Sequence, residues 1–222
     1  MYVPPAFKPD RSACLAFAAA RGFGLVCAHD GRKPVASPLP FTIDYSSDGT
    51  PLLSFHVARN NPIAALANGR APWLMAVSGP GAYVSADWYA SPDQVPTWLY
   101  QSVHLTGPAA VMSEAERDAH LDEASAVFES LLAPKPPWRA SKMTAGRLSA
   151  MKKAIVGVMM RVDEVEGSFK LNQHKSDADH IAVATALAAR PDPDSQAIAA
   201  QMIALRPQLD YNSAAPVAEP AL

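Results

Sequence analysis

Polar and apolar residues alternate most regularly along residues 95–107. At a period of two, this segment predicts a strand with two different faces. One face combines aromatic rings with hydrogen-bonding groups, namely Trp98, Tyr100, Ser102, His104 and Thr106. The other is a core face with one polar interruption, namely Leu99, Gln101, Val103 and Leu105. The first face suits a planar ligand rich in heteroatoms or a wet subunit interface, and cross-strand packing at a dimer contact explains it equally well.

The chain before this strand predicts one helix and a series of short strands. Asp10 is suited to cap the helix, which Gly22 ends after the apolar residues Leu15, Phe17 and Ala18. Turn residues separate the expected strands, which cover 23–29, 34–44, 52–57, 73–78 and 82–85. We expect the Gly79-Pro80-Gly81 run to be a turn.

Helices are concentrated after this strand. Ser113 and Glu116 form a capping box that starts a helix reaching about residue 132. Its expected apolar stripe consists of Leu121, Ala124, Phe128 and Leu131. Further helices are expected at 144–153, 176–189 and 194–205, with a strand at 154–162 and a turn at Glu166-Gly167. From Arg206 onward, the Ala- and Pro-rich composition predicts a disordered tail.

Six or seven strands joined by short turns predict a mainly β (α+β) fold, an antiparallel barrel with flanking helices. We expect one domain over residues 1–190, followed by a C-terminal helix and tail over 191–222.

Two positions in the first half could contact a ligand. Pro38 and Pro40 lie two residues apart, so one side of their strand lacks two N–H groups. This predicts either a sheet edge or an opening where a ligand meets the backbone. Further along, Asn61 can cap a helix that starts at Pro62, and a helix start beside Arg59 is suited to an anion. His56 lies inside an expected strand, where a structural role is more common than a catalytic one.

Composition narrows the class of protein. The chain has 19 Lys and Arg against 21 Asp and Glu, a formal net charge of -2, which argues against a stand-alone DNA-binding domain. Cys14 and Cys27 lie in apolar surroundings and predict buried free thiols in a reducing compartment. No signal peptide, membrane span, zinc-ligand spacing, Walker loop or nucleophile elbow is recognisable, so we expect a cytoplasmic protein without a metal.

Several motifs together carry a resemblance to a known family. They are Met1 to Phe7, Ala36 to Pro40, His56 with Arg59 to Pro62, Gly79-Pro80, Tyr83 to Ser85, Trp88-Tyr89, Val95 to Trp98, Val103-His104 and Lys170-Leu171. With these motifs in this order along the sequence, the chain resembles the PaiB-type FMN-binding proteins, which are often labelled negative transcriptional regulators. Three positions depart from the family pattern, namely Leu99, Asn172 and His174.

The resemblance implies a split β-barrel, like that of pyridoxamine-phosphate oxidases and flavin reductases, and a homodimer with FMN at its interface. Trp98, Tyr100 and His104 could then line the flavin ring, and Arg59, Asn60 and Asn61 could hold the phosphate. His56 belongs to the matching motif, and the backbone of Ser37, Leu39 and Pro40 could bond the flavin edge. Lys170 and Gln173 could reach the flavin or its phosphate.

Three functions compete at this stage. The first is an FMN-binding protein, with or without redox activity as an FMN-dependent oxidoreductase, whose cofactor would explain the lack of catalytic motifs. The second is a transcriptional regulator without turnover, for which direct DNA contact is doubtful because no helix-turn-helix is recognisable. The third is a haem-handling split barrel, favoured only by His174.

Overall fold

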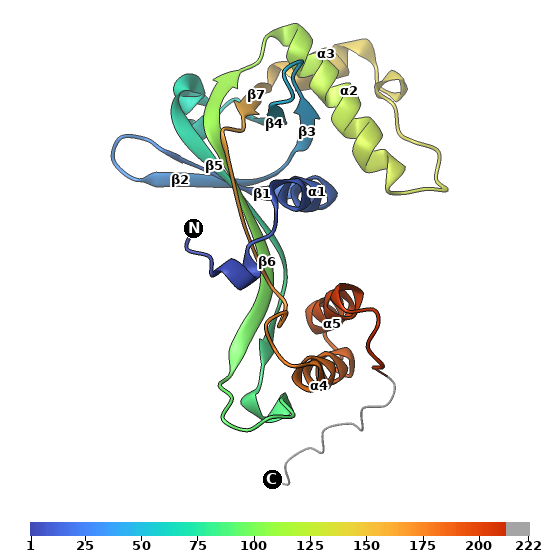
Figure 1. Cartoon of the computed structure of the whole chain (residues 1–222). Helices are drawn as coiled ribbons and strands as arrows, with labels where there is room; N and C mark the ends of the chain where they lie inside the picture. The colour runs from blue at the N-terminus through green and yellow to red at the C-terminus, as the bar shows by residue number, and fades with distance from the viewer. Residues whose placement is uncertain (212–222) are drawn as a thin grey trace. The chain divides into compact units, whose positions relative to one another are not determined.

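The structure is a computed structural model that describes residues 1–211 (Figure 1). The tail expected to be disordered begins at Arg206, and its part from residue 212 onward lies outside the described residues. Its first part is ordered, because Tyr211 packs against a cluster of buried apolar side chains and donates to the Arg206 carbonyl oxygen.

The described chain divides into two compact units. Unit 1 comprises Met1–Arg11, Ser78–Ser102 and the chain from Gly167 onward, and unit 2 comprises Ser12–Val77 and Val103–Glu166. Strands β5, β6 and β8 contribute residues to both units.

The described residues form five α-helices, four short 3-10 helices and eight strands. The α-helices are α1 (Arg11–Arg21), α2 (Glu114–Ser130), α3 (Ala145–Lys153), α4 (Asp177–Ala188) and α5 (Pro193–Leu205). The 3-10 helices are η1 (Pro5–Phe7), η2 (Pro62–Leu66), η3 (Ala86–Trp88) and η4 (Ala140–Lys142). The strands are β1 (Phe23–His29), β2 (Pro34–Pro40), β3 (Thr42–Tyr45), β4 (Pro51–Ala58), β5 (Asn68–Val84), β6 (Thr97–Val111), β7 (Ile155–Arg161) and β8 (Glu164–Lys170).

The strands form one sheet in the order β2-β1-β5-β6-β7-β4-β3, and β8 also pairs with β6. Each pairing with an assigned register is antiparallel. In unit 2, large side chains such as Phe55, Trp73, Met75 and Met160 are buried, and the rings of Phe55 and Trp73 lie 6.3 Å apart. β2 lies at one end of the strand order, which agrees with the sheet edge predicted from Pro38 and Pro40.

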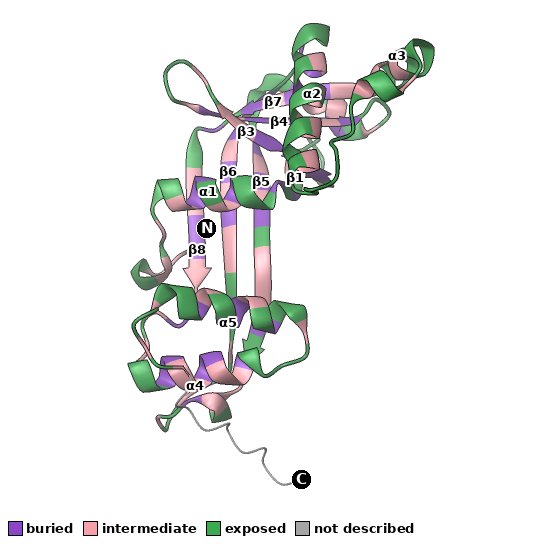
Figure 2. Cartoon of the chain, turned by 90° about the vertical axis from the view of Figure 1, so that its right-hand side faces the viewer, coloured by how far each residue is buried: buried purple, intermediate pink, exposed green. Residues whose placement is uncertain are grey.

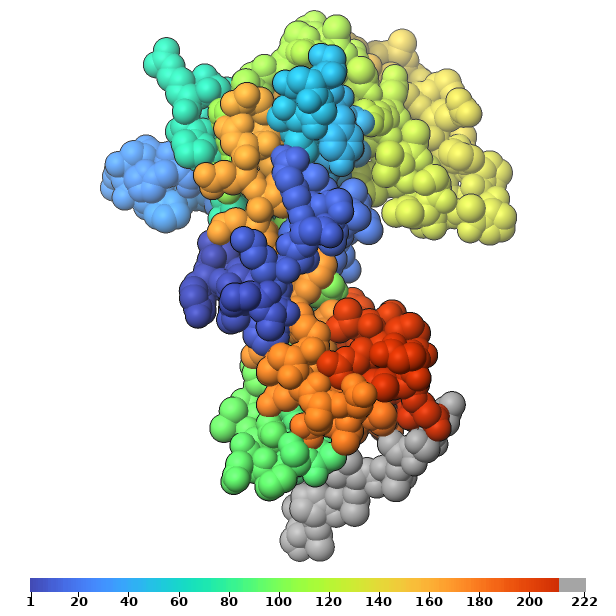
Figure 3. All heavy atoms as spheres, in the orientation of Figure 1, coloured from blue at the N-terminus to red at the C-terminus, as the bar shows by residue number. Residues whose placement is uncertain are grey.

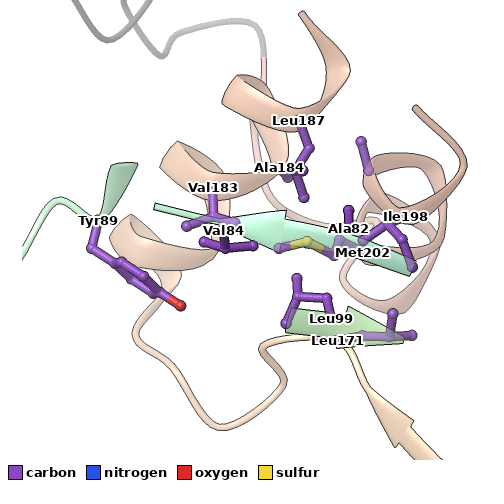
Figure 4. Close-up of a cluster of buried hydrophobic side chains, with 11 residues drawn as sticks. Ala82, Val84, Tyr89, Leu99, Leu171, Val183, Ala184, Leu187, Ile198 and Met202 are labelled. Carbon is purple, nitrogen blue, oxygen red and sulfur yellow. The ribbon is translucent and has the colours of Figure 1, made fainter. Parts of the chain in front are cut away.

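Unit 1 has its own core, in which helices α4 and α5 cover strands (Figure 4). Val84 and Leu99 come from the strands, whereas Val183, Leu187 and Met202 come from the helices. The two helices lie side by side at the red end of the colour scale in Figure 3. Burial of these apolar side chains is the main favourable contribution to the stability of the unit.

The strand predicted from residues 95–107 is present as β6, and its two faces are confirmed. Leu99, Val103 and Leu105 are fully buried, whereas Trp98 and Tyr100 are exposed. Figure 2 shows buried, half-buried and exposed stretches along β6. The sequence also predicted the stop of α1 at Gly22, which adopts a positive φ of 55° and donates its N–H to Ala18.

The predicted turn at Gly79-Pro80-Gly81 is wrong, because these residues continue β5 through to Val84. Pro80 is tolerated because β1 pairs with β5 only at Leu74, Met75 and Ala76, so no bond to β1 is lost farther along. The turn at Glu166-Gly167 is also wrong, because both residues lie within β8. The strand expected at 34–44 is two strands, β2 and β3, separated by the buried Phe41.

The apolar stripe predicted for α2 is confirmed in part. Leu121, Ala124 and Phe128 are half-buried, whereas Leu131, just after the helix, is 73% exposed. The capping box at Ser113 and Glu116 is present. The most buried residues of this helix are polar, namely Arg117 and His120.

Candidate functional site

The twelve predicted site residues divide between the two units. Eight belong to unit 2: Ser37, Leu39, Pro40, His56, Arg59, Asn60, Asn61 and His104. Four belong to unit 1: Trp98, Tyr100, Lys170 and Gln173.

Ser37 and Asn61 come together although they are distant in sequence. The Asn61 side-chain amide donates a 2.9 Å hydrogen bond to Ser37 Oγ. Its side-chain oxygen accepts from the backbone N–H of Ile63, which caps η2. Asn61 therefore fixes the chain just after Arg59 against strand β2. In the same strand, Leu39 is buried and Pro40 is exposed.

The helix expected after Pro62 is only the five-residue 3-10 helix η2. A piece this short supplies little of the aligned dipole on which the predicted anion site relied. Any anion binding at this corner must therefore come from side chains, and Arg59 is the charged one.

Arg59 is exposed but held in place. Its Nε donates to the carbonyl oxygen of Lys153 over 2.7 Å, and one terminal nitrogen donates to that of Ile155 over 3.0 Å. A guanidinium carries five N–H groups and one positive charge. Within residues 1–211, no carboxylate forms an ion pair with it, so its charge and several N–H groups remain free for a ligand.

His56 does not lie with Ser37 and Asn61 but against α2. Its Nδ1 is 3.2 Å from Nε2 of the buried His120. Burial lowers the pKa of His56, and burial together with the charge of His56 lowers the pKa of His120 to about 4. Both imidazoles are therefore neutral at pH 7.

An acidic pair lies near these histidines. Burial and a hydrogen bond with Asp44 raise the pKa of Glu123, and the charge of Asp44 acts on His120. Even so, no three His, Cys, Asp or Glu side chains within residues 1–211 are arranged to hold a metal ion.

His104 lies on the polar face of β6 and is partly buried. Burial is the largest cause that lowers its pKa. A neutral imidazole in this position can donate or accept one hydrogen bond, as a flavin edge requires.

The aromatic face of unit 1 is open. Tyr83, Trp98 and Tyr100 are 49%, 57% and 39% exposed, and the rings of Tyr83 and Trp98 meet edge to face at 6.1 Å. Gly81 lies beside them, and a Cβ there would come within 3.8 Å of Tyr100. Tyr83 was not among the predicted site residues, although its position on the strand expected at 82–85 could have suggested it.

Lys170 and Gln173 are engaged within unit 1. Lys170 donates to the Thr97 hydroxyl, and its ammonium lies 5.9 Å from the centre of the Phe7 ring. The Gln173 side chain accepts from the N–H of Leu171 and donates to the carbonyl of Phe169. Gln173 thus shapes the turn after β8, and Lys170 keeps two of its three N–H donors.

Two of the three departures from the family pattern lie in this same turn. Asn172 is fully buried with a positive φ of 58°, a conformation that Asn tolerates better than most residues. Its side-chain oxygen faces the Tyr89 hydroxyl at 3.4 Å. His174 is exposed and contacts the edge of Phe7, so it offers no special setting for a haem.

Sequence reasoning missed Arg117 and His120. They lie three residues apart on α2, and His120 directly precedes Leu121. A helical repeat counted from residue 117 would therefore have placed them on one face of the helix. Their polar character excluded them from a pattern based on apolar residues.

Among residues 1–211, no helix is both long and apolar enough to cross a membrane.

Comparisons with known proteins agree with this fold. The family model described as "Putative FMN-binding domain" matches residues 1–164. The chain is 29% identical over 204 residues to "Protease synthase and sporulation protein PAI 2" of Bacillus subtilis (strain 168), covering 91% of this chain and 96% of that protein.

Solved structures resemble it at lower identity. A FAD and heme binding protein from Mycobacterium smegmatis has a TM-score of 0.53 at 21% identity, covering 72% of this chain and 71% of that one. The flavocytochrome Anf3 from Azotobacter vinelandii has a TM-score of 0.50 at 17% identity, covering 72% and 67%. At these identities the likeness concerns the fold alone, and the fold class expected from the sequence is confirmed.

Proposed function

Because this chain belongs to the family of FMN-binding domains, whose cofactor is FMN, we propose that it holds the FMN phosphate at the corner formed by Ser37, Arg59, Asn60 and Asn61. The observation that carries the proposal is the bond between Asn61 and Ser37 beside the unpaired charge of Arg59. The side chains of Ser37 on β2 and of Asn61 at the start of η2, two residues after Arg59, are thereby fixed before any ligand arrives.

The donors at this corner fit a phosphate. The Arg59 guanidinium donates two N–H groups to carbonyl oxygens, which fixes its orientation without neutralising its charge. Asn60 is exposed, and the Ser37 hydroxyl can donate while it accepts from Asn61. Charge-assisted hydrogen bonds to phosphate are about twice as strong as neutral ones.

The remaining predicted contacts are part of the proposal. Trp98, Tyr100 and His104 would face the flavin ring, and Leu39 and Pro40 would offer backbone to its edge. Lys170 and Gln173 would contribute side chains. The spare N–H donors of Lys170 and the neutral imidazole of His104 support such roles.

We propose that two copies of the chain form a homodimer through the aromatic face of Tyr83, Trp98 and Tyr100. Contiguous exposed aromatic surface is uncommon on monomers and marks binding sites. A two-fold pairing is the commonest way to cover such a surface.

A bound flavin supplies redox chemistry, and the chain's own residues bind it, orient it and exclude water. We propose a redox-active flavoprotein in the cytoplasm. The alternative is a regulator without turnover, and the Bacillus subtilis relative is named for protease synthesis and sporulation. The net charge of -2 disfavours direct DNA contact, so regulation would act through metabolism or a partner.

Titration of the apoprotein with FMN, followed by flavin fluorescence, tests this proposal. We expect one FMN per chain and a clear preference for FMN over riboflavin, which lacks the phosphate. Equal affinity for FMN and riboflavin would show that the phosphate is not bound at this corner.

A further inference from the structure

A second potential binding site lies around α2 in unit 2. A cavity of about 200 Å³ lies between α2, η4, α3 and the start of β7. Its walls are mostly apolar, with Leu121, Met143, Leu148, Met151 and Ile155. In Figure 3, α2 and the segment that follows it, coloured yellow-green to yellow, lie side by side on the outside of the molecule.

Two further cavities adjoin this one. It shares Leu148 and Lys152 with a cavity of about 350 Å³, and Ser125 and Trp138 with one of about 510 Å³. The three form one cleft with an apolar centre and polar ends. An apolar cavity of about 150 Å³ is enough to hold a benzene molecule, so the centre can admit a ring-sized group.

His56 gives the apolar centre a hydrogen-bonding group. It lines the cavity, whereas its partner His120 does not. Nδ1 of His120 is buried, and no group within residues 1–211 bonds to it. A buried N–H without an acceptor is rarer than a buried acceptor without a donor. This favours the tautomer in which His120 Nε2–H donates to His56 Nδ1, and His56 then carries its own proton on Nε2 as a donor for a ligand.

The end of the cleft at Lys152 has more positive than negative charge. Asp118 accepts from both Arg117 and Lys152, at 2.8 and 3.0 Å, so one carboxylate serves two cations. Lys153 and Glu114 line the same cavity and add one charge of each sign. Asp122 adds a negative charge at the centre, so the excess of positive charge is confined to the end at Lys152, where an anion would balance it.

We propose that this cleft binds a small carboxylic acid with an aromatic or branched apolar body. The body would lie among Leu148, Met151 and Ile155, and the carboxylate would accept from His56 Nε2 and pair with Lys152. The site gives His56 a ligand other than FMN. It also lies next to the flavin corner, because Arg59 holds the carbonyls of Lys153 and Ile155, whose side chains line the cleft.

1-Naphthoate is a suitable probe because its own fluorescence reports binding. We expect one naphthoate per chain, and at least tenfold weaker binding of 1-naphthylmethylamine, which has a similar ring and the opposite charge. Saturating FMN should leave the naphthoate affinity within about twofold. Absent naphthoate binding, equal binding of the amine, or stoichiometric displacement by FMN would each overturn the proposal.

Leu148→Trp locates the probe, because the larger ring fills the centre of the cleft. We expect it to weaken naphthoate binding at least tenfold, whereas Leu131→Trp, at an exposed position just after α2, should leave binding unchanged. If Leu148→Trp does not fold, His56→Phe serves instead, since it removes the donor and should erase the preference for naphthoate over the amine. Unchanged binding in the folded variant would contradict the site.

Discussion

His56 Nδ1 on β4 lies 3.2 Å from His120 Nε2 on α2, and this contact joins the helix to the sheet through two neutral imidazoles. Protonation of either ring would place a positive charge in a buried setting beside its neighbour. The pairing therefore makes the stability of unit 2 depend on pH.

The folded-state pKa of His120, about 4, lies below the ordinary value of 6.5 because of burial and the nearby His56. As the pH falls from about 6.5 toward 4, the unfolded chain takes up a proton that the folded chain does not, so stability declines over this window. We expect a loss of at most about 3 kcal/mol. Urea unfolding at pH 7, 5.5 and 4.5 measures it, and His120→Gln should show a shallower decline. An identical decline in that variant would assign the effect to other groups.

Gly107 on β6 is required by close approach of the backbone. A Cβ at this position would lie 1.7 Å from the carbonyl oxygen of Arg161, which is part of β7. We expect Gly107→Ala to destabilise the fold by more than about 3 kcal/mol, because backbone would have to move. Gly146 in α3 is the matched control, since nothing lies within 4 Å of its Cβ position. Gly146→Ala should stabilise by up to about 1 kcal/mol. Denaturant midpoints of the two variants compare them directly.

Asn172 holds the turn after β8 in a left-handed conformation, with φ of 58°. Ala in that conformation is strained by about 1–2 kcal/mol, and Gly is not. We therefore expect Asn172→Ala to be less stable than Asn172→Gly by that amount in thermal or urea unfolding. Equal stability of the two variants would show that the backbone changes conformation there.

The prediction of a homodimer rests on the exposed ring of Trp98. Sedimentation at micromolar concentration should give about twice the chain mass of 23.6 kDa. Trp98→Glu should shift the protein toward monomer, because a charge would be buried in the interface. Tyr45→Glu changes an equally exposed aromatic residue in unit 2 and should leave the mass unchanged. A wild-type monomer with full FMN occupancy would contradict the homodimer.

The sequence was most informative where a local pattern decides the structure. Alternation placed Leu99 and Val103 inside and Trp98 outside because successive residues of a strand point to opposite faces. Gly79-Pro80-Gly81 was misinterpreted because glycine and proline predict a turn from the local sequence alone. Whether Pro80 can lie in a strand depends on where the pairing of β1 with β5 ends, which the local sequence does not show.

The candidate site shows the same division. Arg59 and Asn61 stand in one short motif that the sequence displays directly. Asn61 contacts Ser37, and Arg59 donates to the carbonyl oxygens of Lys153 and Ile155. In each of these contacts, the two residues are 24 or more positions apart in the sequence. Only the folded chain brings such partners together. For the same reason, the contact between His56 and His120 could not be predicted from the sequence.

The most direct test of the account compares FMN with riboflavin in wild type, in Arg59→Ala and in Arg190→Ala, a surface control in unit 1. The ratio of the two dissociation constants isolates the phosphate contact, because any loss of structure affects both ligands. A charge-assisted contact worth about 1.5–3 kcal/mol predicts that wild type and Arg190→Ala prefer FMN by about tenfold to a hundredfold. In Arg59→Ala this preference should fall to within about twofold. An Arg59→Ala protein that keeps the full preference for FMN would contradict the phosphate site.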